Sequence, residues 1–374
     1  MPLRQPFISH LRKKYSALAQ QDLESITAEY LLSPFEIELP KEVLSQAQEF
    51  VRLAYMMAHT PEAQRRTKEM LSKKGLKAQP HASLFMSYDF HLGADGILKL
   101  IEINTNAAFY FLGSEMYDCR NLPQPVSQDP LKDLLQDLNT EFDLLGRRPS
   151  SSMKVQIVDE NPEQQRLYLE FLVAQTWLRE QGHQVDICDR EAAKECDFIY
   201  NRSTDFYFED SASLNLRNLY NEGKTLISPQ PAEYYALADK ERMIEWQNSE
   251  LKKYLPPAFL LSPETIERAW AERKNLFFKP TRAFGSKMTY KGASIAKKAF
   301  EAMDLNGGAM AQGLVPAPEI ERETPAGPQK FKYDLRFYAY QNEVRSVVAR
   351  VYQGQVTNLK TDWGGFCPVL FKPS

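Results

Sequence analysis

Strand-like and helix-like segments alternate in the middle of this chain. Between residues 153 and 200 the apolar pattern predicts a buried strand, a helix that Gly182 stops, and two further short strands: Lys154–Val158, Glu163–Gln181, Gln184–Cys188 and Phe198–Tyr200. Strands that alternate with helices are typical of a parallel sheet with crossover helices. The fold class that this pattern predicts is α/β.

The length and charge of the chain set limits on its organisation and partners. With 374 residues, two or three domains are expected. Its 43% hydrophobic and 25% charged residues are ordinary for a globular protein. A formal net charge of -3 gives no broad attraction to nucleic acid or to an anionic membrane, so we expect small-molecule partners.

The cysteines and the first residues indicate a compartment. The four cysteines form no CxxC pair, so we expect a reducing environment and neither a zinc site nor a disulfide framework. The segment Met1–Pro6 lacks the apolar core of a signal peptide, and no apolar run reaches the ~18 residues that span a membrane. A soluble, cytoplasmic protein is the expectation.

Outside the α/β unit, a helix and a hairpin are predicted early in the chain. Residues 41–58 carry apolar side chains at helical spacing, and Pro40 suits a helix entry. Two strand-like runs follow, Ser83–Phe90 and Ile97–Asn104, with a turn-forming Asp-Gly pair between them. The other expected elements are a proline-rich connector at 119–152 with one helix near 131–144, a helix at 234–254, and the strands Leu276–Lys279, Ala309–Gln312, Tyr333–Tyr340 and Val344–Tyr352.

The hairpin carries a candidate metal site. Glu102 and Asn104 lie two residues apart and therefore on one face of their strand, and strand pairing can bring Asp89 to the same face. Oxygen ligands of this kind suit Mg²⁺, which binds one or two carboxylates together with substrate phosphates. A surface hairpin with ordinary polar side chains is the alternative.

Several cationic and small residues form a candidate phosphate site. Lys279 ends an apolar strand, where an ammonium is costly to bury without an anion, and the stretch with Phe284, Gly285 and Ser286 follows it. Lys240 opens a predicted helix. The spacing of a Walker loop is absent, so a strand-end lysine that reaches water, a plain loop and a solvent-exposed Lys240 remain alternatives.

The C-terminal part of the chain adds candidate ligands. The backbone around Gln312 and Leu314 could bond an adenine edge, although the local sequence favours a simple strand-to-loop exit. Arg336 and Arg350 could bind carboxylate or phosphate from the same end or from opposite ends of their strand pair. Three further candidates are Asn358 and the pair Gly364-Gly365, whose amides could face an oxyanion. Arg202, at a strand end, could clamp a carboxylate or lie on the surface.

The motifs together resemble a known superfamily, the ATP-grasp ligases. The block Met310–Gly365 is similar to that of bacterial glutathione synthetases, with Met-Ala-Gln-x-x-Val-Pro-Ala, Asp-x-Arg, Ala-Arg-Val-x-Gln-Gly, Asn-Leu and Gly-Gly in that order. Ala238–Arg242 resembles the lysine-bearing helix start of D-alanine–D-alanine ligases. The hairpin around Glu102 resembles the metal strand that usually comes last.

The resemblance implies α+β lobes of the ATP-grasp fold in circularly permuted order, with a Rossmann-like domain that normally precedes them. Residues 1–118 would be the C-terminal part of the core placed first, with its metal hairpin at 83–106, and 119–152 a connector. Residues 153–233 would be the pre-ATP-grasp domain, 234–312 the N-lobe and 313–374 the C-lobe that residues 1–118 complete.

The resemblance also implies a reaction and residue roles. ATP with two Mg²⁺ ions, or Mn²⁺ in their place, would activate a carboxylate as an acyl phosphate, and an amine would then form an amide. Lys240 and Lys279 would hold the α- and β-phosphates, and the loop at Phe284-Gly285-Ser286 would close over them. Gln312 and Leu314 would frame the adenine, while Asp89, Glu102 and Asn104 would bind metal. Arg336 and Arg350 would serve the transferred phosphoryl and acyl groups, and Asn358 would assist the second metal.

The acceptor class and the oligomeric state are open at this point. Asn106-Ala107-Ala108 replaces a segment that often carries Pro-Gly and contacts the acceptor, and a homodimer is compatible with the sequence. The substrate would be an amino acid or a small peptide. A phosphotransferase that acts on a hydroxyl and a non-catalytic nucleotide-binding module are the competing interpretations.

Overall fold

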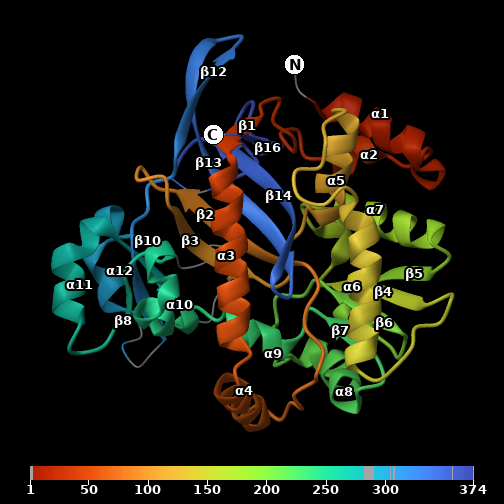
Figure 1. Ribbon diagram of the computed structural model, residues 1–374, viewed down its shortest axis with the longest axis horizontal. Coiled ribbons are helices and arrows are strands. Elements are labelled where there is room, and N and C mark those ends of the chain that lie inside the picture. Colours follow the sequence, from red (N-terminus) through yellow and green to blue (C-terminus); the bar gives the residue numbers. More distant parts are fainter. Residues whose placement is uncertain (1–2, 282–289, 304, 306–307, 356, 374) are drawn as a thin grey trace.

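The computed structural model describes residues 3–281, 290–303, 305, 308–355 and 357–373 (Figure 1). The segment Phe284-Gly285-Ser286, which we expect to close over a triphosphate, lies outside these residues. Three sheets account for most of the strands, and each is built from a different part of the chain.

The central sheet joins early and late segments of the sequence. Its order is β15-β14-β13-β2-β3, all antiparallel, and β12 pairs with β13 (Figure 1). The strands are β2 Met86–Leu92, β3 Leu98–Asn104, β12 Glu319–Thr324, β13 Gly327–Tyr340, β14 Glu343–Tyr352 and β15 Gly365–Cys367. The predicted hairpin of β2 and β3 is confirmed, and its register places Asp89 directly opposite Glu102.

A long amphipathic helix covers one face of this sheet. Helix α3, Lys41–Ala58, has the bounds that its apolar spacing predicts, and its buried stripe runs along one side. Phe50 on that stripe is fully buried, and its ring meets the rings of Tyr88 and Phe90 edge-on at 6.0 and 5.3 Å. The helix therefore fixes the two strands that carry the candidate metal ligands.

The second sheet is the parallel one that the alternating pattern predicts. Its order is β5-β4-β6-β7, and every pair is parallel. The strands are β4 Lys154–Asp159, β5 Gln184–Asp189, β6 Phe198–Asn201 and β7 Leu226–Ser228, with helices α7 Tyr168–Glu180 and α8 Leu214–Glu222. The helix predicted from Glu163 begins later, because a 3-10 turn at Pro162–Gln164 precedes it.

The third sheet is antiparallel, has the order β10-β9-β11-β8 and has its own small core. Its elements are β8 Ala258–Leu260, α11 Ile266–Glu272, β9 Leu276–Pro280, β10 Tyr290–Lys291, α12 Lys297–Glu301 and β11 Ala309–Gly313. Phe278 packs its ring against Phe300 of α12 at 4.9 Å. In Figure 1 this sheet and its helices form a lobe at the left of the central sheet.

The single helix predicted over 234–254 is wrong. The chain there forms α9 Pro231–Glu233, a π-helical turn Tyr234–Ala238, α10 Glu241–Glu245 and two 3-10 turns, Trp246–Asn248 and Glu250–Tyr254. The breaks fall where short polar side chains bond the backbone: Asp239 accepts from the N–H of Glu241, and Ser249 accepts from that of Leu251. Such local bonds compete with helix propagation. The break at Asp239 places Lys240 at the head of a new helix.

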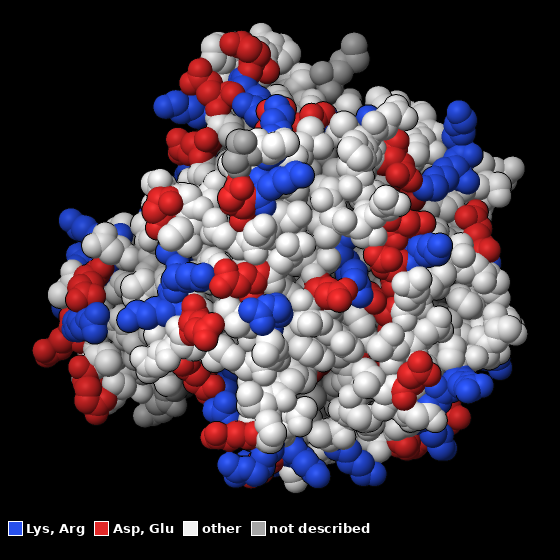
Figure 2. Space-filling view, in the orientation of Figure 1, with Lys and Arg blue, Asp and Glu red and all other residues white. Residues whose placement is uncertain are grey.

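The remaining elements surround these sheets. They are α1 Arg4–Lys14, α2 Leu23–Ile26, α4 Pro61–Lys73, α5 Tyr110–Cys119, α6 Pro130–Leu144 and the parallel pair of β1 Ile37–Pro40 with β16 Val369–Lys372. None of the helices in the described part of the chain is long and apolar enough for a membrane span. On the face in Figure 2, basic and acidic side chains are interspersed over most of the surface.

Candidate functional site

A cleft of about 570 Å³ lies where the three sheets meet. Its walls carry residues from β2 and β3, from β9 and β11, from β13 and β14, and from the ends of β4 and β6. The sequence-predicted residues that line it are Asp89, Glu102, Asn104, Arg202, Lys240, Lys279, Gln312, Arg336, Arg350 and Asn358. Residues far apart in the sequence therefore share one cavity.

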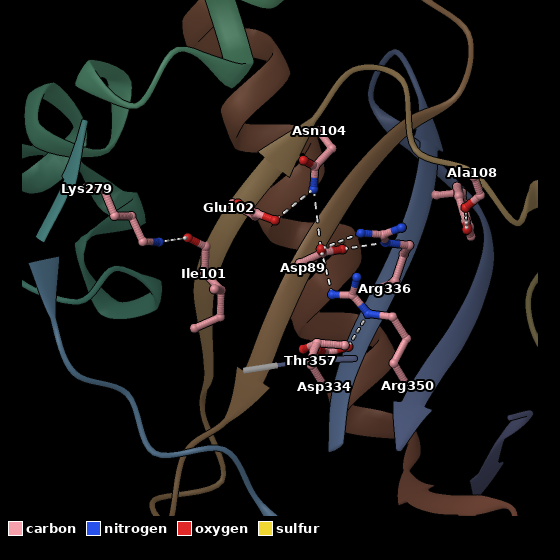
Figure 3. A network of polar contacts seen from close by, with 11 residues as sticks. Asp89, Ile101, Glu102, Asn104, Ala108, Lys279, Asp334, Arg336, Arg350 and Thr357 are labelled. Carbon is pink, nitrogen blue, oxygen red and sulfur yellow. Dashed lines mark hydrogen bonds and ion pairs between the residues drawn. The ribbon is translucent and has the colours of Figure 1, made fainter. Parts of the chain in front are cut away.

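A buried chain of charges forms the floor of the cleft (Figure 3). Asp89 accepts from Nε and Nη2 of Arg336 at 2.8 and 2.7 Å and from Nη2 of Arg350 at 2.8 Å. Arg350 also donates to Asp334 at 2.6 Å. The two arginines thus lie at the same end of the β13–β14 pair. Burial raises the pKa of Asp89, but the two guanidiniums outweigh burial and hold the pKa below its usual range.

Glu102 and Asn104 lie beside this chain of charges, on one face of β3. Nδ2 of Asn104 is 3.4 Å from Oε1 of Glu102 and 3.3 Å from Oδ2 of Asp89. Glu102 is half-buried at the cleft wall, whereas both oxygens of Asp89 already accept from arginines. Among the described residues no group of three His, Cys, Asp or Glu side chains is placed for a metal. Glu102 with Asn104 fits Mg²⁺ that takes its other ligands from water and phosphate.

Two lysines face Glu102 from the neighbouring elements. Nζ of Lys279, on β9, lies 3.4 Å from the carbonyl oxygen of Ile101. Burial lowers the pKa of Lys279, Glu102 opposes the shift, and Lys240 lowers the pKa further. The pKa of Lys240 is likewise lowered by burial and raised by Glu102. Two desolvated ammonium groups within electrostatic reach of one another fit a ligand with several negative charges.

The segment around β11 forms the far wall. Gln312 donates from Nε2 to the Ile101 carbonyl at 3.4 Å, and its buried Oε1 has no hydrogen-bond partner among the described residues. That oxygen can accept from a ligand amino group. Leu314 does not line the cleft, although its neighbours Gly313 and Val315 do, and its N–H bonds Asn275 at 2.8 Å.

Arg202 closes the cleft at the carboxyl edge of the parallel sheet, which is where open α/β sheets bind ligands. Its Nε and Nη1 are buried and have no hydrogen-bond partner among the described residues. Asp159, at the end of β4, lines the same region. Burial raises the pKa of Asp159 to about 6, and Arg202 opposes that shift. Asp159 was not among the residues predicted from the sequence, although a polar residue at the end of a predicted parallel strand was a usable signal.

The other C-terminal candidates have structural contacts. The amide of Asn358 bonds its own loop, through Gln353 and Lys360, while the residue lines the cleft. Gly364 and Gly365 are not among the lining residues. Gly365 has a φ of +112°, and a Cβ there would lie 2.5 Å from the Tyr30 carbonyl oxygen, so close packing requires this glycine.

Comparisons with known proteins support the fold. The sequence matches no family model, and no curated protein matches it. A solved glutathione synthetase-like effector from Globodera pallida superposes with a TM-score of 0.54 at 13% identity, over 91% of this chain and 90% of the other. A putative γ-glutamylcysteine synthetase from Methylobacillus flagellatus gives a TM-score of 0.42 at 12% identity, over 83% and 84%. This chain therefore shares its overall fold with that glutathione synthetase-like effector.

Proposed function

We propose that the protein is an ATP-dependent carboxylate–amine ligase that forms an amide through an acyl phosphate. The observation that carries this proposal is the meeting of Lys240 and Lys279 with Glu102 and Asn104 in one cleft. Half-buried cations near oxygen ligands suit a metal-bound polyphosphate, and the fold supports the assignment. The substrate class that we propose is an amino acid or a small peptide.

The nucleotide fits the residues that are present. Lys240 and Lys279 would neutralise the phosphates, and Oε1 of Gln312 would accept from the adenine amino group. Glu102 and Asn104 would hold Mg²⁺, which when bound neutralises phosphate oxygens and orients them. We propose that Asp89 acts mainly by holding Arg336 and Arg350 in place, since its oxygens are already paired.

The reaction then needs positioning more than covalent chemistry from the protein. A carboxylate oxygen of the substrate attacks the γ-phosphorus, the bond to the bridging oxygen breaks, and ADP leaves. The amine nitrogen attacks the acyl carbon, the carbon–oxygen bond to phosphate breaks, and the nitrogen loses a proton. We propose that Arg336 and Arg350 bind the transferred group. Arg202 would bind a substrate carboxylate through Nε and Nη1, which have no hydrogen-bond partner among the described residues.

A substrate screen tests the proposal. Purified protein with ATP and Mg²⁺ is incubated with pairs of amino acids and small peptides, ADP release is measured, and the products are identified by mass spectrometry. We expect ADP release that depends on both substrates and an amide product. A phosphate ester as the product would favour a phosphotransferase, and no ADP release with any pair would overturn the proposal.

Variants link the activity to the cleft. Glu102→Gln should lower ADP release by about 10²–10³-fold, as removal of a charge-stabilising group in an active site typically does. The exposed Glu38→Gln, which loses only a surface ion pair with Lys372, should retain wild-type rates. Unchanged turnover in Glu102→Gln, with an intact circular dichroism spectrum, would remove Glu102 from the site.

A further inference from the structure

The segment that connects β3 to α5 is held from several sides. We call residues 105–112 the bridge segment: it begins directly after Asn104 and runs into the first turn of α5. Phe109 within it has a φ of +80°, an uncommon conformation for a bulky residue, and its ring stacks on Phe366 at 3.6 Å. Such a backbone persists only where the surroundings determine it.

Asn106 attaches the bridge segment to the backbone of the substrate arginine. Its Nδ2 donates to the carbonyl oxygen of Arg202 at 2.9 Å and to that of Ser203 at 3.0 Å. Both N–H bonds of one amide group are used in this way. The guanidinium of Arg202 lies over the rings of Phe171 and Tyr200, 5.7 Å from each centroid, and the two Asn106 bonds hold the backbone from which the side chain extends.

Two other elements hold the same segment. The hydroxyl of Tyr338, on β13, donates to the carbonyl oxygen of Ala108 at 2.6 Å. The fully buried carboxyl group of Glu170, on α7, accepts from the N–H groups of Tyr110, Phe111 and Leu112 at 2.8, 3.1 and 2.9 Å. Glu170 therefore caps α5 from another part of the chain, where orphan N–H groups need acceptors. Contacts from β13 and α7 thus hold the bridge segment in place, and with it the backbone of Asn106.

We propose that Asn106 is a positioning residue that sets Arg202 relative to the metal strand β3. The inference deepens the proposed function and rests on it for the role of Arg202 in binding a carboxylate. Asn106 lies two residues after Asn104 and lines the same cleft, so it transmits the position of β3 directly to residues 202–203. An aspartate could not replace it, because a carboxylate facing two carbonyl oxygens has no donor.

Kinetics with the best substrate pair from the screen test this inference. Asn106→Ala should raise the KM for the carboxylate substrate about tenfold, the equivalent of ~1.4 kcal/mol, while kcat and the KM for ATP stay within about twofold. Asn221→Ala is a matched control, since Asn221 is also half-buried and also donates to a backbone carbonyl, that of Gly75, away from the cleft. Its constants should equal those of the wild type.

A double-mutant cycle separates positioning from a general structural role. In an Arg202→Ala background, Asn106→Ala should change the KM for the carboxylate substrate little further, because the group that it positions is gone. Additive effects of the two substitutions would overturn the inference. A rise in the KM for ATP as large as that for the carboxylate would overturn it too.

Hydrogen exchange gives a readout that does not need turnover. The amides of residues 202–206 should exchange at least about fivefold faster in Asn106→Ala than in the wild type. Their exchange rates should be unchanged in Asn221→Ala. If the exchange rates of these amides are unchanged in both variants, the Asn106 bonds do not hold residues 202–203, and the inference is refuted. If exchange is faster in Asn106→Ala but the wild-type protein releases no ADP, the Asn106 contacts hold residues 202–203 as inferred and the proposed function is rejected.

Discussion

At the scale of single residues, Asp89 is the carboxylate that pairs with both Arg336 and Arg350. Asp89→Asn removes the carboxylate that pairs with Arg336 and leaves Arg350 with Asp334 alone, and breaking such buried pairs typically costs ~3–5 kcal/mol. Urea denaturation of the variant and the wild type measures this loss. Glu272→Gln, at an exposed ion pair with Arg268, should show no measurable change.

The pH dependence of that loss follows from the lowered pKa of Asp89. An aspartate carboxyl group in an unfolded chain has a pKa of ~3.9, and the pKa of Asp89 in the folded protein is lower. The contribution of Asp89 to stability is therefore complete above the unfolded pKa. It is lost as the pH falls through the folded pKa. The gap between wild type and Asp89→Asn should therefore be largest at neutral pH and shrink below about pH 4. A gap of constant size down to acid pH would contradict the pairing.

Glu141 should give the opposite dependence of stability on pH. It is fully buried on α6, its Oε1 accepts from the N–H of Ala82 and from the Tyr340 hydroxyl, and its Oε2 has no partner among the described residues. Burial raises its pKa to about 8. The stability that the protonated group contributes is complete below the unfolded value of ~4.3 and is lost as the pH rises through the folded pKa.

Glu141→Gln should therefore raise the midpoint of thermal unfolding at pH 8 and above, and change it little near pH 4. Thermal scans across this range measure the effect, with the exposed Glu343→Gln as the control that leaves the pH profile unchanged. A midpoint difference that is the same at every pH would show that Glu141 does not titrate in this way.

At the scale of elements, α3 holds the central sheet through one ring. Phe50 meets Tyr88, Phe90, Trp246 and Tyr254 at centroid distances of 5.3 to 6.4 Å. Phe50→Ala should cost about 3–5 kcal/mol of unfolding free energy, as large-to-small changes in cores do. Met56→Ala on the same helix, with its side chain 54% exposed, should cost far less, and equal losses would contradict the packing.

The same elements show how far the sequence could predict the fold. Helix α3 was predictable to the residue because its apolar stripe repeats at helical spacing over 18 residues. The parallel sheet was predictable because strand-like and helix-like segments alternate between residues 153 and 200. The single helix predicted over 234–254 is interrupted at Asp239 and Ser249, where the side chains bond the backbone. Both residues are common helix caps, and that signal was present.

The candidate site likewise contains residues that local sequence patterns predict and contacts that only the tertiary structure shows. Alternation along β3 was enough to place Glu102 and Asn104 on one side, and apolar neighbours marked Lys279 as costly to bury. The ion pairs of Asp89 with Arg336 and Arg350 depend on the register of β13 with β2 and β14, which no local pattern encodes. The clamp of Asn106 on Arg202 joins residues 96 positions apart, so its existence needed the tertiary structure.

At the scale of the whole molecule, the order of the segments along the chain, with residues 40–108 before residues 153–374, is itself a testable feature. Early and late parts of the chain lie side by side, since β1 pairs with β16 and the N–H of Ser33 bonds the carbonyl oxygen of Phe366 at 2.8 Å. Both marked chain ends lie in the upper part of Figure 1. The resemblance to bacterial ligases predicts that residues 153–374 once preceded residues 40–108.

A rearranged chain tests that order directly. Joining residue 374 to residue 1 by a glycine-serine linker of about ten residues, and opening the chain between the exposed Ser150 and Ser151, restores the predicted order without changing a contact of the core. We expect this protein to unfold within a few degrees of the wild type. A chain opened between the buried Gly113 and Ser114 of α5 should fail to fold. If both rearranged chains fail, the linear order is itself required for the fold, because closing a loop of this length alone costs little.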